Sequence, residues 1–138
     1  MRKAEEIAEE RKRILAMLRD DTIDVEEAVG QLATLDASWS DFAQRNNDGV
    51  AAEKSGDLTT AIVLYELNAR DGFEGNHPYD RLAIIYRKLK RPTDEKRILQ
   101  KAIQVFQELE RTSPRTDVAP KLARFEERLR KLCGKDPA

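Results

Sequence analysis

The residues between Phe42 and Leu109 repeat a pattern of small and large apolar side chains at an interval of 34 positions. A helix-turn-helix unit of this length can bury its apolar face only against a neighbouring unit, so the interval predicts two stacked helical hairpins. The pairs that carry the repeat are Gly49 and Ala83, Ala52 and Tyr86, Ser55 and Leu89, Leu64 and Ile98, Tyr65 and Leu99, and Asn68 and Ala102.

Composition supports a helical fold for the rest of the chain. Of its 138 residues, 37% are charged and 40% hydrophobic, and only six are glycine. A chain rich in Ala, Leu, Glu, Lys and Arg favours helices, and no segment alternates like a strand. We therefore predict an all-α fold of about seven helices in a single domain over residues 1–138.

Capping residues mark where the helices should begin. Asp24 with Glu27 predicts a capping box, and Gly56-Asp57 predicts a tight turn between two helices. Ser38, beside Trp39, and Thr93 are further cap candidates. The expected helices cover residues 3–19, 24–35, 38–54, 57–71, 77–89, 94–111 and 118–132.

Residues 42–109 resemble two divergent tetratricopeptide (TPR) repeats. Gly49 stands at the small position of a first helix, and Ala61 with Tyr65 resembles the small and aromatic pair of a second helix. In the next unit, Ala83 and Tyr86 match the first helix. The resemblance implies an α-solenoid of helix-turn-helix hairpins, with residues 117–132 as a C-terminal capping helix.

Three residues depart from the TPR pattern. Glu95 stands where the first unit has the small Ala61, and Asn68 replaces an alanine. Lys90 replaces the glycine of the turn, and the family's tryptophan is missing from both first helices.

Residues 1–37 form a further expected hairpin, with two interpretations. Ala28 and Leu32 lie 33 residues before Ala61 and Tyr65, which suggests a third repeat with a turn one residue shorter. The segment also resembles short helical hairpins that mediate self-association in bacterial proteins. The apolar stripe of its first helix would then drive oligomers, or be buried against the third helix; the stripe consists of Ile7, Ile14, Leu15 and Leu18.

Charge is distributed unevenly although the net charge is −1. Residues 20–75 have a net charge of −10, whereas residues 81–101 have +6 and residues 111–131 have +4. This pattern fits solvated faces that balance within one fold. It also fits two faces for different partners, or head-to-tail self-contact.

The sequence contains none of the usual catalytic or ligand motifs. Cys133 and His77 are the only cysteine and histidine, and no phosphate loop, zinc pattern or nucleophile elbow occurs. We expect no enzyme, no catalytic residues, no metal and no cofactor. No segment has the length and apolarity of a membrane span or signal peptide, so we expect a cytoplasmic protein.

The function that follows is a non-catalytic protein-protein interaction module, an adaptor or assembly subunit that binds a partner peptide or helix in a TPR-like groove. The alternatives are a self-assembling structural protein and a nucleic-acid-associated regulator; the acidic half makes nucleic acid the weaker of these. We expect an acidic partner near Arg81, Arg87 and Lys88. The candidate groove residues are Asn46, Asn47, Val50, Glu53, His77, Asp80, Arg81, Ile84, Arg87 and Lys88.

Overall fold

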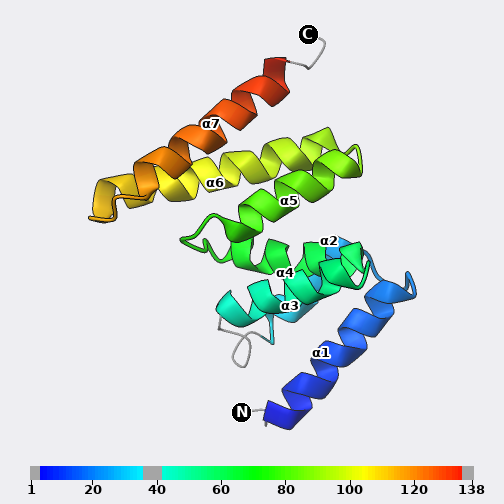
Figure 1. Ribbon diagram of the computed structural model, residues 1–138. Helices are drawn as coiled ribbons and strands as arrows, with labels where there is room; N and C mark the ends of the chain where they lie inside the picture. Colours follow the sequence, from blue (N-terminus) through cyan, green and yellow to red (C-terminus); the bar gives the residue numbers. More distant parts are fainter. Residues whose placement is uncertain (1–3, 36–41, 135–138) are drawn as a thin grey trace. The chain divides into compact units, whose positions relative to one another are not determined.

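The chain is all-α, as the sequence predicts. A computed structural model describes residues 4–35 and 42–134, and these residues form seven helices that pack against their neighbours in the chain. The helices divide between two compact units, residues 1–70 and 71–138. In order they are α1 (Ala4–Arg19), α2 (Val25–Ala33), α3 (Phe42–Lys54), α4 (Leu58–Arg70), α5 (His77–Lys88), α6 (Pro92–Thr112) and α7 (Val118–Gly134) (Figure 1).

The N-terminal unit is built around α4. This helix contacts α1, α2 and α3, and 9 of its 13 residues are buried. Its sequence explains the arrangement, because the run from Leu58 to Tyr65 contains no charged side chain. A helix that is apolar on all sides must be covered from several directions.

The N-terminal hairpin α1–α2 covers one side of α4. Ile14 and Leu18 of α1 share a buried apolar cluster with Val63, Leu64 and Leu67 of α4. The stripe considered for self-association is therefore largely used inside the unit. The cluster contains residues of α4 and none of α3, so Ile14 and Leu18 pack against the fourth helix where the sequence suggested the third.

In the C-terminal unit, α6 lies between α5 and α7 and packs against both (Figure 1). Three buried rings join the helices: Tyr79 of α5, Phe106 of α6 and Phe125 of α7, with centroids 5.4–6.5 Å apart in edge-to-face contact. The Tyr79 hydroxyl donates a hydrogen bond to the Phe73 carbonyl, 2.7 Å away. Burial, and then the nearby carboxylate of Glu74, raises the pKa of Tyr79.

Three hairpin turns share one backbone geometry. Asp21, Gly56 and Lys90 each follow a helix in the left-handed conformation, with φ of 62°, 82° and 56°. In each turn the next residue donates its N–H to a carbonyl five positions back, the Schellman pattern of helix ends. These bonds join Thr22 to Met17 (2.8 Å), Asp57 to Ala52 (2.9 Å) and Arg91 to Tyr86 (2.9 Å).

The first turn is longer than the other two, whereas the sequence interval suggested a shorter one. In two of the turns a single residue, Asp57 or Arg91, stands between the left-handed residue and the next helix. In the first turn Thr22 and Ile23 stand between the left-handed Asp21 and the capping residue Asp24. Ile23 is buried in the apolar cluster of the N-terminal unit. The longer turn therefore contributes one residue, Ile23, to the core.

The capping predictions are partly correct. The Asp57 carboxylate accepts from the Thr60 N–H (3.1 Å), and that of Asp24 accepts from the Glu27 N–H (2.8 Å). The Glu27 carboxylate, however, accepts from Gln31, so the reciprocal capping-box bond is replaced. Thr93 lies inside α6, because the helix begins at Pro92, whose fixed φ suits a first helical position.

Two further expectations need comment. Leu89, one of the apolar residues of the 34-residue repeat, is 42% exposed because α5 ends at Lys88 and the turn directs the next residues to solvent. Ser38 and Trp39 lie outside the described residues.

Candidate functional site

A groove of about 550 Å³ lies between α5 and α7 within the C-terminal unit. Ile84 and the buried ring of Phe125 supply apolar surface, and nearly all other lining side chains are basic. The lining residues are His77, Asp80, Arg81, Ile84 and Arg87 of α5, with Lys121, Arg124, Phe125 and Arg128 of α7.

Helical periodicity places these side chains together. On α5 the lining positions recur every three or four residues from His77 to Arg87, which is the spacing of one helix face. The residues between them, including Tyr79, Leu82 and Tyr86, are buried. The core-facing residues of α5 therefore leave its charged face to line the groove.

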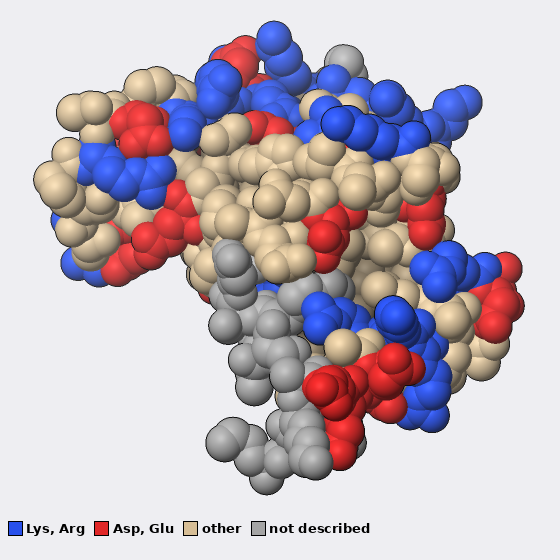
Figure 2. Space-filling view, turned by 60° about the horizontal axis from the view of Figure 1, so that its bottom comes forward, with Lys and Arg blue, Asp and Glu red and all other residues tan. Residues whose placement is uncertain are grey.

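The groove combines five formal cations with one carboxylate, Asp80. That carboxylate is already engaged, because it accepts from Arg128 at 2.7 Å and from the Asn76 amide at 2.5 Å. Arg124 is exposed and forms no ion pair within the part of the chain that the structure describes. Figure 2 shows that Lys and Arg side chains gather most densely along the top of the face drawn, with Asp and Glu side chains beside them in several places. The formal charge of the groove lining is therefore positive.

Arg87 has a second role at one end of the groove. Its guanidinium bonds the Glu95 carboxylate of α6 through two nitrogens, at 3.2 and 3.0 Å. Glu95 is only 2% exposed, whereas the Arg87 side chain is 62% exposed. The glutamate that departs from the TPR pattern is therefore satisfied by the first helix of its own hairpin.

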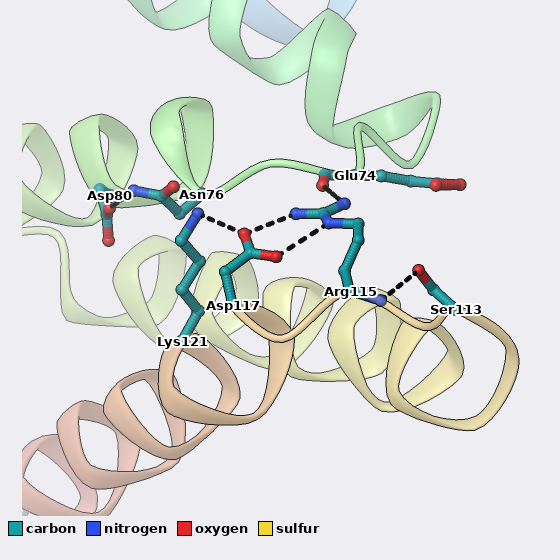
Figure 3. A network of polar contacts seen from close by, with 7 residues as sticks. All are labelled: Glu74, Asn76, Asp80, Ser113, Arg115, Asp117 and Lys121. Atoms are coloured by element: carbon teal, nitrogen blue, oxygen red, sulfur yellow. Dashed lines mark hydrogen bonds and ion pairs between the residues drawn. The ribbon is translucent and has the colours of Figure 1, made fainter.

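A polar network fixes the loop before α7 against the loop before α5 (Figure 3). Arg115 donates hydrogen bonds to both carboxylate oxygens of Asp117, at 3.0 and 2.9 Å, and to the Glu74 carbonyl, at 2.6 Å. Lys121, a groove residue, also donates to Asp117, at 2.8 Å. Hydrogen bonds from Arg115, and then from Lys121, hold the pKa of Asp117 well below its usual range. The network positions Lys121 at the groove.

Five of the ten sequence-predicted residues line this groove: His77, Asp80, Arg81, Ile84 and Arg87. Lys88, at the end of α5, is exposed and lies outside its lining. Partner binding by Lys88 stays a prediction. The lining cation near that end is Arg87.

The other four predicted residues belong to α3 in the N-terminal unit, and two have bonds within their hairpin. The Asn46 side chain accepts from the Asn68 amide (2.8 Å), and Glu53 accepts from the Tyr65 hydroxyl (2.6 Å). Asn68 also accepts from the buried Arg45, 3.2 Å away, so the asparagine that replaces the TPR alanine joins α3 to α4. Asn47 is exposed and Val50 half-buried. Partner binding by these four stays a prediction.

Sequence reasoning missed the contribution of α7, which it treated only as a capping helix. The signal was present in the positions of Lys121, Arg124 and Arg128, which recur at helical spacing. We counted the net charge of +4 over residues 111–131 but did not consider which face of the helix carries it.

Within residues 4–35 and 42–134, no group of three or more His, Cys, Asp or Glu side chains has an arrangement that could hold a metal ion. A search of the described helices for a candidate membrane span finds none. Comparison with known proteins finds no family model, curated sequence or solved structure that matches the chain.

Proposed function

We propose that the protein is a non-catalytic protein-protein interaction module, and that the groove between α5 and α7 binds an acidic peptide or helix of its partner. The observation that carries this proposal is the lining of the groove, which holds five cations and a single carboxylate; Arg124 has no ion-pair partner among the described residues, whereas Arg87, Lys121 and Arg128 each have one. Arginine suits this role because its planar guanidinium can bind a carboxylate through two nitrogens. Ile84 and Phe125 would contact the apolar part of the same segment.

We further propose that α3–α4 and α5–α6 are related TPR-like repeats. Their turns support this relationship, because the left-handed residues Gly56 and Lys90 lie 34 positions apart with the same hydrogen-bond pattern. The first-helix residues Glu53 and Arg87, also 34 positions apart, each bond the second helix of their hairpin, although their partners Tyr65 and Glu95 stand at different positions of the repeat. A repeat architecture suits binding, since such proteins present extended surfaces to their partners.

A defined probe can test the groove. A fluorescent helical peptide with glutamates at four-residue spacing should bind the chain, and binding should weaken with added salt. Arg124→Gln should lower the affinity about tenfold, the effect of losing roughly 1.4 kcal/mol, without lowering the melting temperature. Lys96→Gln on α6 is the matched control, because Lys96 is exposed and lies outside the groove.

Two results would overturn the proposal. One is equal affinity of the Arg124→Gln and Lys96→Gln variants for the acidic peptide. The other is tighter binding of a single-stranded DNA oligonucleotide of the same charge, which would favour the nucleic-acid alternative.

A further inference from the structure

The turn between α1 and α2 presents a dense acidic surface. Residues 20–27 contain five acids and no base, and all five acidic side chains are exposed. None forms an ion pair within the part of the chain that the structure describes. We call this surface the acidic corner; it consists of Asp20, Asp21, Asp24, Glu26 and Glu27.

Local structure accounts for only some of these acids. Asp20 accepts from the Thr22 hydroxyl, 2.6 Å away, and Asp24 caps α2. Asp21 and Glu26 form no side-chain bond within the described residues. Asp21 also follows the C-terminal end of α1, where the helix dipole disfavours negative charge, and has a left-handed φ of 62°. The helix dipole therefore does not explain the acid at position 21, although an aspartate suits the left-handed conformation better than most residues.

The same chain contains a complementary surface. Residues 1–70 hold 15 acids and 9 bases, whereas residues 71–138 hold 11 acids and 16 bases. The basic groove includes the unpaired Arg124, and the acidic corner includes the unpaired Asp21 and Glu26. A net charge of −1 means that two copies do not repel each other at long range.

We infer that the basic groove binds the acidic corner of a second copy of this chain. The inference rests on the proposed function of the groove and names its ligand. Because the two surfaces differ, the contact is heterologous: one copy of the pair keeps its corner free and the other keeps its groove free. Assembly therefore proceeds head to tail, and salt weakens it by screening the exposed charges.

Two variants test this arrangement by removing one surface each. Arg124→Glu disrupts the groove and keeps the corner, whereas Asp21→Asn with Glu26→Gln neutralises the corner and keeps the groove. Matched controls carry the same charge changes elsewhere: Lys96→Glu, and Glu110→Gln with Glu126→Gln, all exposed positions outside both surfaces. Circular dichroism melts establish that every variant is folded.

Sedimentation velocity from about 5 to about 500 µM, at about 20 and about 500 mM NaCl, gives the readout. The wild-type mass should rise at least about twofold with concentration at low salt and return to the monomer value at high salt. The control variants should behave as the wild type. Each surface variant alone should stay monomeric, and an equimolar mixture of the two should form a 1:1 dimer that grows no further.

Three results would overturn the inference. The first is a wild-type chain that stays monomeric at every concentration, and the second is association that survives in both surface variants. The third is a salt-dependent change in shape at constant mass, which would indicate that the two surfaces bind within one chain. The acidic peptide probe separates these failures from failure of the proposed function. Peptide binding by the Asp21→Asn, Glu26→Gln variant would retain the groove as a binding site even if the wild type never self-associates.

Discussion

The ring of Tyr65 lies so close to Gly49 that a Cβ atom on the glycine would stand 2.5 Å from Cε1. Tyr65 has no exposed surface, and its hydroxyl donates to Glu53 at 2.6 Å. The ring therefore cannot move aside without breaking that bond. Gly49 lets α3 approach α4 at this point, and the repeated small position of the sequence has a direct physical explanation.

Gly49→Ala should lower the free energy of unfolding by about 1–3 kcal/mol, the usual cost of overpacking a core. Gly30→Ala is the matched control, because no atom lies within 4 Å of a Cβ at that helical position. The control should stabilise the protein by about 0.5–1 kcal/mol through helix propensity. Urea denaturation measures both, and equal effects of the two substitutions would contradict the close contact.

Lys90→Gly should stabilise the chain. Lys90 has a φ of 56°, a conformation that costs a residue with a side chain roughly 1–2 kcal/mol and costs glycine little. After the greater entropy of an unfolded glycine is subtracted, a gain of about 0.5–1 kcal/mol remains. Lys96→Gly inside α6 should instead destabilise by about 1 kcal/mol. Thermal melts that shift the same way for both variants would refute a left-handed Lys90.

Arg87→Glu should destabilise the protein, so it is a poor variant for testing binding alone. The substitution would place a second carboxylate beside Glu95, which is 2% exposed and bonded to Arg87. We expect a loss of about 1–3 kcal/mol for an unsatisfied buried group. Lys88→Glu, one residue along and exposed, should change stability by less than about 0.5 kcal/mol. Equal denaturation midpoints for these two variants would show that the Glu95 bond contributes little.

Stability should fall in acid through Asp117. Its pKa is lower in the folded chain than the value of about 3.9 expected when unfolded. The unfolded state therefore binds the proton first as pH falls, and the stabilisation present above about pH 4 is lost below it. The difference in unfolding free energy between wild type and Asp117→Asn should be constant near neutral pH and shrink below about pH 4. An undiminished difference at about pH 2 would contradict the ion pairs of Figure 3.

The helices were largely predictable because their signals are local. Apolar spacing and the Asp24 and Asp57 caps located α2 and α4 to within a few residues, since each cap bonds an N–H three positions away. Errors occurred where two local rules compete. Thr93 is a good cap by type, but Pro92 begins the helix earlier, because a proline at the first helical position loses no hydrogen bond.

The candidate site was only half predictable because it depends on contacts between segments. Arg81 and Arg87 share a helix face, which the sequence reveals, but the approach of Arg124 depends on how α7 packs against α6. The role of Glu95 was hidden for the same reason. From the sequence alone, a glutamate at the position of an alanine looks unfavourable for packing. The structure shows that its carboxylate is bonded to Arg87, eight residues earlier.

The burial of α4 on nearly every side has a practical consequence for any fragment of this protein. A piece beginning at residue 42 would retain the hairpins α3–α4 and α5–α6 yet lose α1 and α2. A contiguous apolar surface would then face water, because Val63, Leu64 and Leu67 would have lost their partners Ile14, Leu18 and Leu32. We expect such a fragment to precipitate or to dimerise through this apolar surface. Any oligomers that it forms would then result from the truncation. The hairpin α1–α2 thus covers the apolar side of α4 and, being part of the same chain, keeps that side from binding other molecules.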